Sequence, residues 1–310
     1  MTASDLLRRP PDDRSRAALE SFGVVNLDKP PGPSAHQVAA WVRDLVGVDR
    51  AAHAGTLDPK VTGCLPVLLG DATRMAQVFL EGVKEYVAVL ELHGPVPTDL
   101  DSVVEEFEGP LYQKPPRKSA VTRRLRVREV YAMDVLDVDE RQVLLRIRCE
   151  SGTYIRKLCH DLGLALGTGA HMGHLRRTAT TPFDDRSLVT LHDLADAIAF
   201  ADGEDGDPDE GPFRDVVAPA ERALVHLPRV TIAPSAAEQV ATGAPVYAPG
   251  VIGVDSAPEP VPETATGIEA EEGDLVACYT PDGSAVCLGR LVGDPDAERG
   301  EVVSLERVLV

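Results

Sequence analysis

A ten-residue run, GEDGDPDEGP at 203–212, divides this 310-residue chain into two parts. The run is too polar and too rich in turn-forming residues to pack, so we expect an acidic surface loop there. The length of the chain corresponds to about two domains of roughly 150 residues each. We therefore predict an N-terminal arm at 1–21, a larger domain at 22–228 and a smaller domain at 229–310.

The larger part mixes helical and strand periodicities. Val38, Trp41, Val42 and Leu45 recur at helical spacing after Ser34, which predicts an amphipathic helix that ends at Gly47. Further helices are expected at 71–82, 154–166 and 191–201, and strands at 65–69, 85–93, 130–138 and 143–149. Because apolar and polar residues alternate along these strands, they should be half-buried and antiparallel. The fold class is α+β: a mixed, mainly antiparallel sheet with flanking helices.

The smaller part predicts a compact β-structure. Strand patterns lie at 230–232, 274–279 and 285–292, with a Pro-Asp-Gly turn between the last two. A helix is expected at 235–242, with Glu238 in a capping position and Gly243 as its stop. Residues 255–269 have low complexity and predict a disordered insertion. These features indicate a small β-barrel with one helix.

Charge is distributed unevenly along the chain. Residues 1–200 carry 28 acids and 25 bases, whereas 201–310 carry 22 acids and 6 bases. The total of −19 taken alone argues against a nucleic-acid partner. The alternative is an acidic, Lys-poor surface suited to a salt-rich cytoplasm, where the Debye length falls to about 3 Å at 1 M. Composition does not choose between these two interpretations.

The segment 114–128, KPPRKSAVTRRLRVR, holds seven basic residues and no acid. Such a density of positive charge is typical of surfaces that meet phosphate. We predict that this stretch contacts the backbone of a nucleic acid, with Arg123 and Arg124 among the contacting residues.

Cysteine content and hydropathy exclude several classes. The five cysteines contain no CxxC pair, so neither a disulfide framework nor a zinc ribbon is expected, and we predict no metal site. No apolar run approaches the ~20 residues that cross a bilayer, and the first residues lack an apolar signal core. We expect a cytoplasmic protein without a membrane partner.

Two segments place charged residues where chemistry could occur. Asp58 lies in a loop bounded by Gly and Pro, just before a buried strand, although an isolated Asp-Pro pair more often marks a turn. Arg156 lies in the first turn of a predicted helix, where its charge opposes the helix dipole. A carboxylate that faces such an arginine is held ionised, as a nucleophile or base must be. Spacing alone leaves open whether the two residues meet.

Several separated motifs occur in one order along the chain: GVVNLDKPPGPSAHQV at 23–38, HAGTLDPKVTGCLPVLLGDATR at 53–74, KEY at 84–86, SGTYIRKL at 151–158 and GAHMGHLRRT at 169–178. Together they resemble the TruB/dyskerin family of pseudouridine synthases. Lys60, LHG at 92–94, YQKPP at 112–116 and LVTLHDL at 188–194 are similar to the archaeal box H/ACA enzyme. The resemblance spans about 22–227, and the C-terminal part is more loosely similar to the RNA-binding PUA domain.

The resemblance implies an isomerisation of uridine to pseudouridine in RNA, without metal or organic cofactor. It assigns Asp58 as the catalytic aspartate, Arg156 as its ion-pair partner and Tyr86 as the aromatic ring that stacks on the target base. Tyr154, Leu175 and His53 are implied as substrate-binding residues, His53 by helping to hold the RNA with its base flipped. A base inside a helix must be extruded before chemistry, which costs a few kcal/mol.

The resemblance also implies partners: a box H/ACA guide RNA, target rRNA or tRNA, small Nop-type and Gar-type proteins, and a kink-turn-binding protein. Two alternatives stay open. One is a stand-alone synthase that acts on the T-loop uridine of tRNA, and the other is a non-catalytic scaffold for H/ACA RNA. Asp58, Tyr86 and Arg156 argue against the scaffold, because a scaffold needs no ionised carboxylate in a loop.

Overall fold

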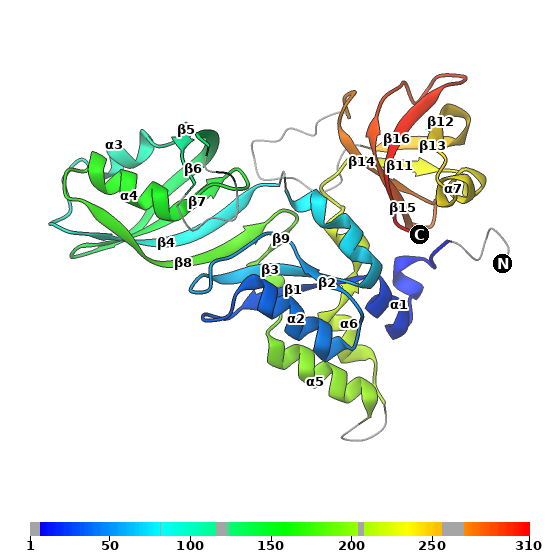
Figure 1. Cartoon of the computed structure of the whole chain (residues 1–310), viewed down its shortest axis with the longest axis horizontal. Helices are drawn as coiled ribbons and strands as arrows, with labels where there is room; N and C mark the ends of the chain where they lie inside the picture. Colours follow the sequence, from blue (N-terminus) through cyan, green and yellow to red (C-terminus); the bar gives the residue numbers. More distant parts are fainter. Residues whose placement is uncertain (1–6, 81, 116–121, 123, 204–207, 256–269) are drawn as a thin grey trace.

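The computed structural model describes residues 7–80, 82–115, 122, 124–203, 208–255 and 270–310. Two β-sheets dominate it, and Figure 1 shows the smaller sheet beside one end of the larger. The predicted insertion, apart from residue 255, and residues 204–207 of the predicted acidic loop lie outside the described residues. Within the described ranges, no helix has the length and apolar character needed to cross a bilayer.

Ten strands of the described chain form the larger sheet. Eight follow one another side by side: β10 (Ala218–Pro219), β1 (Gly23–Lys29), β3 (Thr62–Leu69), β8 (Ala170–Thr180), β4 (Lys84–Leu92), β7 (Gln142–Cys149), β6 (Arg126–Asp139) and β5 (Gly109–Gln113). β2 (Ala51–His53) pairs with β3, and β9 (Phe183–Asp184) pairs with β8. Among these described strands only β3 and β8 run parallel, with Gly63 opposite Arg177. The predicted mixed, mainly antiparallel sheet is confirmed.

β4 shows how the sequence pattern produces this sheet. Lys84, Tyr86, Ala88, Leu90 and Leu92 are buried, and the residues between them are half-buried. Successive side chains of a strand point to opposite faces, so one face of β4 enters the main core and the other is partly covered. The strand therefore sits between β7 and β8 near the centre of the sheet.

The helices that pack around the larger sheet are α1 (Arg16–Ser21), α2 (Ala35–Val46), α3 (Leu100–Glu105), α4 (Ile155–Ala165), α5 (Leu191–Asp202) and α6 (Gly211–Val216). α2 begins with a capping box between Ser34 and Gln37 and ends at Gly47, whose φ of 77° is left-handed. Its buried side includes alanines, whereas Trp41 and Leu45 are 45% and 39% exposed. The helix is confirmed, but the prediction that these two residues belong to its buried stripe is wrong.

Where the sequence predicts a helix over 71–82, the structure has a tighter 3-10 helix, η3 (Gly70–Phe79). Its buried residues Ala72, Met75 and Val78 recur every three positions, which is the period of a 3-10 helix rather than of an α-helix. The other 3-10 segments described are η2 (Pro11–Asp13), η4 (Asp185–Ser187), η5 (Ala220–Ala223) and η6 (Ala248–Gly250).

The smaller sheet is a curled half-barrel of six strands in the described residues. Their order is β12 (Val246–Tyr247), β16 (Glu301–Val308), β15 (Ala285–Leu291), β14 (Leu275–Tyr279), β11 (Arg229–Ile232) and β13 (Val251–Asp255). β14 and β15 are joined by the predicted Pro-Asp-Gly turn, in which the Gly283 amide donates to the Thr280 carbonyl at 3.0 Å. One helix of the described chain, α7 (Pro234–Ala241), packs against this sheet.

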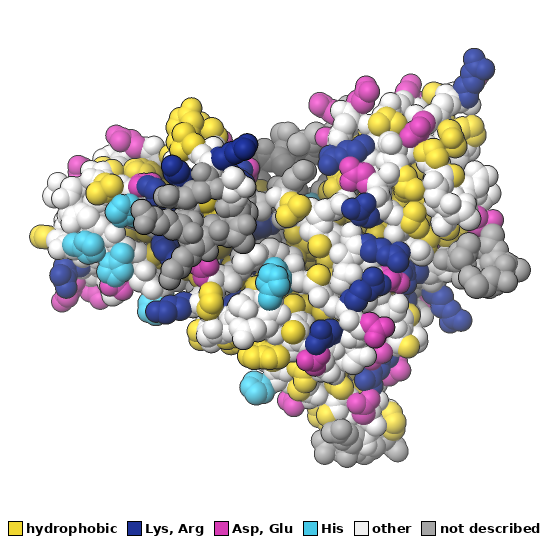
Figure 2. All heavy atoms as spheres, in the orientation of Figure 1, with side chains coloured by type: hydrophobic (Ala, Val, Ile, Leu, Met, Phe, Trp, Pro, Cys, Tyr) yellow, Lys and Arg dark blue, Asp and Glu magenta, His cyan; other side chains and the backbone are white. Residues whose placement is uncertain are grey.

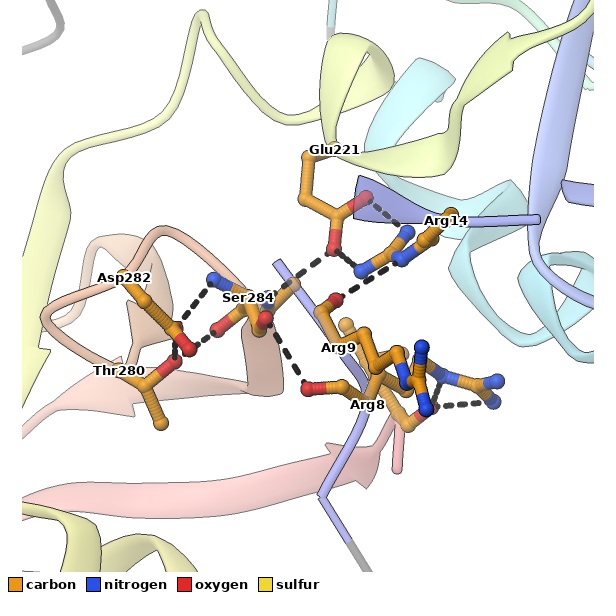
Figure 3. Close-up of polar contacts among 9 residues, drawn as sticks. Arg8, Arg9, Arg14, Glu221, Thr280, Asp282 and Ser284 are labelled. Atoms are coloured by element: carbon orange, nitrogen blue, oxygen red, sulfur yellow. Dashed lines mark hydrogen bonds and ion pairs between the residues drawn. The ribbon is translucent and has the colours of Figure 1, made fainter. Parts of the chain in front are cut away.

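The two sheets share a hydrophobic core and a polar seam. Phe22 and Phe79 from the larger part pack in one cluster with Leu288 and Leu309 from the smaller part. Figure 3 shows the seam, where residues before α1 reach both parts. We call this seam the arm junction, defined by Arg8, Arg14, Glu221, Ser284 and Leu309.

Candidate active site

The loop between β2 and β3 carries Asp58, and a buried lysine fixes it. Lys29 is fully buried at the end of β1, and its Nζ donates to the carbonyls of Pro30, Pro59 and Val61 at 2.8–3.0 Å. The amide of Gly32 also donates to the Pro59 carbonyl at 2.8 Å. Burial lowers the pKa of Lys29, and the charge of Asp58 opposes that shift. The backbone around Asp58 is thus held by the strand next to it.

Asp58 and Arg156 meet, although 98 residues separate them in the chain. Nη2 of Arg156 lies 2.6 Å from Oδ2 of Asp58. The side chain of Arg156 is 60% exposed and that of Asp58 is 55% exposed, so the ion pair lies at the surface of the protein. The carboxylate therefore faces solvent.

A side chain from β5 sets the start of α4 and hence the position of Arg156. Gln113, 1% exposed, accepts from the Tyr154 amide at 2.8 Å and donates to the Tyr154 carbonyl at 3.4 Å. One turn earlier, Glu150 binds the Arg128 guanidinium at 2.6 Å. These contacts join α4 to the edge strands of the larger sheet. Tyr154 is half-buried, directly before the helix.

Tyr86 lies beside a buried arginine at the centre of the sheet. Gly63, Arg177 and Tyr86 stand side by side across β3, β8 and β4. Arg177 is 1% exposed and donates to the Cys64 carbonyl at 2.7 Å. Burial raises the pKa of Tyr86, and the Arg177 guanidinium opposes this shift. A side chain at Gly63, whose φ is 98°, would lie 2.2 Å from the Arg177 carbonyl oxygen, so only glycine permits this contact.

Three residues assigned from the sequence as substrate contacts lie on β4, β8 and β2. Tyr86 is 9% exposed and packs in the main core, and Leu175, opposite Ala88, packs against the same core. His53 ends β2, and its Nε2 lies 3.1 Å from Nδ1 of His36. Burial and the neighbouring His36 lower the pKa of His53, so the imidazole is neutral at neutral pH.

The basic segment is only partly described. Arg124 is exposed, and Arg123 lies outside the described residues. Arg128, which belongs to the same segment, is 19% exposed and already bound to Glu150. One cation of the segment, Arg128, is thus paired within the protein itself.

A second basic surface lies next to the arm junction. Asp71 is surrounded by three arginines, with Arg50 at 2.6 Å, Arg8 at 3.2 Å and Arg74 at 3.5 Å. Figure 2 shows dark blue side chains along the middle of the visible face, where the smaller sheet adjoins the larger. Arg50 and Arg74 are 56% and 41% exposed, so this surface keeps excess positive charge in an acidic chain.

Sequence reasoning assigned no role to Lys29, Gln113 or Arg177. Each is a buried polar residue that binds backbone carbonyls or amides around the loop or around α4. The signal that could have found them is their type: a charged or amide side chain at a buried position of a strand needs partners. Cys64 is buried as expected, and burial raises the pKa of its thiol to about 12.

Three family models match successive parts of the chain and define its class as an RNA pseudouridine synthase. The family model for "TruB family pseudouridylate synthase (N terminal domain)" matches residues 43–99. The model for "tRNA pseudouridylate synthase B C-terminal domain" matches 156–225, and that for "PUA domain" matches 228–309. The chain belongs to the TruB family of pseudouridine synthases and is an RNA-modifying isomerase.

Individual relatives match along almost the whole chain. "Probable tRNA pseudouridine synthase B" of Halobacterium salinarum is 70% identical over 98% of this chain and 99% of its own length. The protein of the same name from Haloarcula marismortui is 65% identical over 98% of this chain and 94% of its own length.

Solved structures match equally far. A chain in the crystal structure of a Cbf5-Nop10-Gar1 complex has a TM-score of 0.89 and 44% identity, covering 98% of this chain and 90% of that one. A chain in an H/ACA RNP bound to a substrate RNA containing 2′-deoxyuridine has a TM-score of 0.87 and 42% identity, covering 98% and 90%.

Proposed function

We propose that this chain is the catalytic subunit of a box H/ACA guide ribonucleoprotein that converts uridine to pseudouridine in rRNA and tRNA. The observation that carries the proposal is the ion pair of Asp58 and Arg156, in a loop held by Lys29. The agreement over 98% of the chain with proteins solved in H/ACA complexes supports the guided form of the activity.

In the proposed reaction, Asp58 is the nucleophile that starts cleavage of the bond between N1 of uracil and C1′ of ribose. The uracil then rotates in place, C5 bonds to C1′, C5 loses its proton and N1 gains one, so the composition of the RNA is unchanged. Arg156 holds the carboxylate in place through their ion pair at 2.6 Å. Tyr86 stacks on the target base, which offsets part of the cost of flipping by ~1–3 kcal/mol. Tyr154, Leu175 and His53 complete the substrate site.

The same relatives support part of the proposed assembly. Partners of the proposed subunit are a guide RNA, a Nop-type and a Gar-type protein, and a kink-turn-binding protein on the same RNA. The first two kinds of protein occur with the matched chain in a solved complex. We propose that 22–228 is the catalytic domain and 229–310 the PUA-like RNA-binding domain, working in the cytoplasm. The exposed Arg124 extends the proposed RNA surface.

A second candidate is a stand-alone tRNA enzyme, favoured by the names of the relatives in Halobacterium salinarum and Haloarcula marismortui. Mapping pseudouridine in unmodified tRNA and rRNA, with and without guide RNA and partner proteins, separates the two. Guide-dependent modification of rRNA supports the proposed subunit. Efficient modification of rRNA by the isolated chain would contradict it.

The nucleophile is tested by Asp58→Asn, which keeps the shape of the side chain and removes its charge. We expect turnover to be abolished while affinity for RNA changes little, because asparagine keeps the shape and hydrogen-bonding capacity of the side chain. Pseudouridine formation in a single turnover and RNA affinity are measured separately.

The matched control is Asp134→Asn, which breaks another exposed ion pair, with Arg146 at 3.0 Å. It should leave turnover near that of the parent protein. Near-normal single-turnover rates in Asp58→Asn would refute the assignment and favour the scaffold or another carboxylate.

A further inference from the structure

A pocket of about 420 Å³ opens to solvent between α2 and β2. This volume is within the roughly 300–1,000 Å³ of pockets that hold small ligands. Four alanines, two on each element, form its apolar walls, and His36, Arg43 and His53 supply the polar groups. Because alanine side chains are short, the space between the helix and the strand stays open.

The polar groups of the pocket suit a nucleobase. The rings of His36 and His53 meet edge to face, with centroids 4.5 Å apart and an interplanar angle of 76°. Nε2 of His53 and Nδ1 of His36 face each other at 3.1 Å, and histidine ring nitrogens form hydrogen bonds of the kind that base edges form. Histidine rings and arginine planes are also surfaces on which proteins stack unpaired RNA bases.

Charge supports the same kind of occupant. The residues that line the pocket include no acid, although the chain as a whole carries −19. Arg43 is 43% exposed, and its guanidinium forms an ion pair with Asp44 at 2.6 Å. A lining that is neutral or positive tolerates the phosphate attached to a bound nucleotide.

The pocket is close to the proposed reaction site. His53 precedes Asp58 by five residues, so their Cα atoms lie at most about 18 Å apart. The segment before α2 is also joined to the same loop, through the hydrogen bond from Gly32 to Pro59. The pocket is therefore within reach of the nucleotides next to a uridine that is presented to Asp58.

We propose that the pocket binds one unstacked nucleobase of the substrate strand, near the target uridine, with its ring against His36 and its phosphate near Arg43. This inference rests on the proposed function, in which the uridine reacts at Asp58. It assigns α2 a part in holding the strand beside the flipped base.

The test combines a filled pocket with abasic RNA. In Ala40→Leu, a larger side chain occupies the pocket on a half-buried position of α2, and leucine is a good helix former. Ala199→Leu on α5 is the matched control, because Ala199 is also half-buried in a helix and lies outside the pocket. Affinity and single-turnover rate are measured with guide, partners and target RNAs that are abasic at each of three positions on either side of the uridine.

We expect Ala40→Leu to bind the complete target 5- to 150-fold more weakly, equivalent to roughly 1–3 kcal/mol at 1.4 kcal/mol per tenfold. At one position, removal of the base should weaken RNA binding by the parent protein by a similar factor. The same abasic RNA should bind to Ala40→Leu as tightly as the complete target does. The inference would be overturned if Ala199→Leu lost as much RNA affinity as Ala40→Leu. It would also be overturned if each abasic position weakened binding by the same factor in Ala40→Leu as in the parent protein. If the parent protein modifies the complete target while this coupling is absent, only the pocket assignment fails. Absence of any modification refutes the proposed function and this inference with it.

Discussion

Lys84, the first residue of β4, is a buried side chain whose pKa differs strongly from that in water. It is 3% exposed, and its Nζ donates to the Phe79 carbonyl at 2.9 Å. Burial lowers its pKa to about 7, and the charge of Arg177 adds to this effect. In the unfolded chain the same group stays protonated up to about pH 10.4.

This difference makes stability depend on pH in a defined direction. Between pH 7 and 10 the unfolded state binds more protons at Lys84, so the free energy of unfolding rises with pH, by at most about 1.4 kcal/mol per unit. Lys84→Met removes the titration. We expect the stability of the parent protein relative to Lys84→Met to rise by up to about 2.7 kcal/mol from pH 7 to pH 9, measured by chemical denaturation. Parallel pH profiles of the two proteins would contradict this.

Lys29 gives a second prediction at the same scale. Lys29→Met keeps the length of the side chain but removes its hydrogen bonds to the carbonyls of Pro59 and Val61, so we expect the loop that carries Asp58 to shift. A displacement of about 1 Å costs about 100-fold in rate. We expect the single-turnover rate to fall by that order while RNA affinity changes little. An unaltered single-turnover rate in a folded variant would show that Lys29 does not position the loop.

Single residues differ in how far the sequence reveals them. Asp58 and Arg156 were identified because each occupies an unusual local position, and the structure brings them together. Gln113 and Arg177 have no local anomaly, since their partners are backbone groups brought near only by the tertiary fold.

At the scale of elements, β-strands are predicted better than helix types and caps. The alternation in β4 and β7 gives both their positions and their buried faces. α7 is present, but Glu238 does not cap it: Ala233 is the N-cap, without a side-chain hydrogen bond, and Pro234 begins the helix. Proline at the first position fixes φ and has no N–H, so the start of this helix has one fewer donor that needs an acceptor.

The arm junction supplies an element-scale prediction. Arg14 binds both oxygens of Glu221 at 2.7 and 2.5 Å, and Glu221 also accepts from the Ala285 amide at 3.1 Å (Figure 3). Arg14→Met leaves a buried carboxylate without its cation. We expect the free energy of unfolding to fall by about 3–5 kcal/mol, measured by chemical denaturation.

Two further variants control this result. Arg14→Met with Glu221→Met removes both charges and should cost less than Arg14→Met alone, because no buried charge is left unpaired. Arg16→Met breaks partly exposed ion pairs with Glu20 and Asp202 and should cost about 1 kcal/mol or less. If Arg14→Met and Arg16→Met lowered the free energy of unfolding equally, burial of the Arg14–Glu221 pair would not increase its contribution to stability.

At the scale of the whole molecule, the balance of charge predicts how RNA binding responds to salt. A protein that depends on phosphate contacts loses affinity with a slope of about −0.9 per contact on duplex DNA. A chain of net charge −19 should depend more on arginine forks, stacking and shape. We expect affinity for guide RNA to fall by less than about tenfold from moderate to molar KCl, measured by titration at each salt concentration. A steep slope that implies many phosphate contacts would contradict this.

The two sheets and their order along the chain follow from the sequence, but the contact between them does not. The shared cluster of Phe22, Phe79, Leu288 and Leu309 combines residues whose local patterns give no sign of one another. Charge segregation correctly separated an acidic C-terminal part, yet the cationic surface around Asp71 lies next to that part rather than within it. The shared cluster and the cationic surface both combine residues that only the tertiary fold brings together.

The arm junction also has a consequence for synthesis. Arg8 donates to the Leu309 carbonyl at 3.0 and 2.9 Å, and these residues are 301 positions apart. A ribosome therefore makes the arm long before it makes the strand that receives it. Until β15 and β16 have emerged, Arg14 and Glu221 lack the sheet that buries them, so the arm can close only as a last step of maturation.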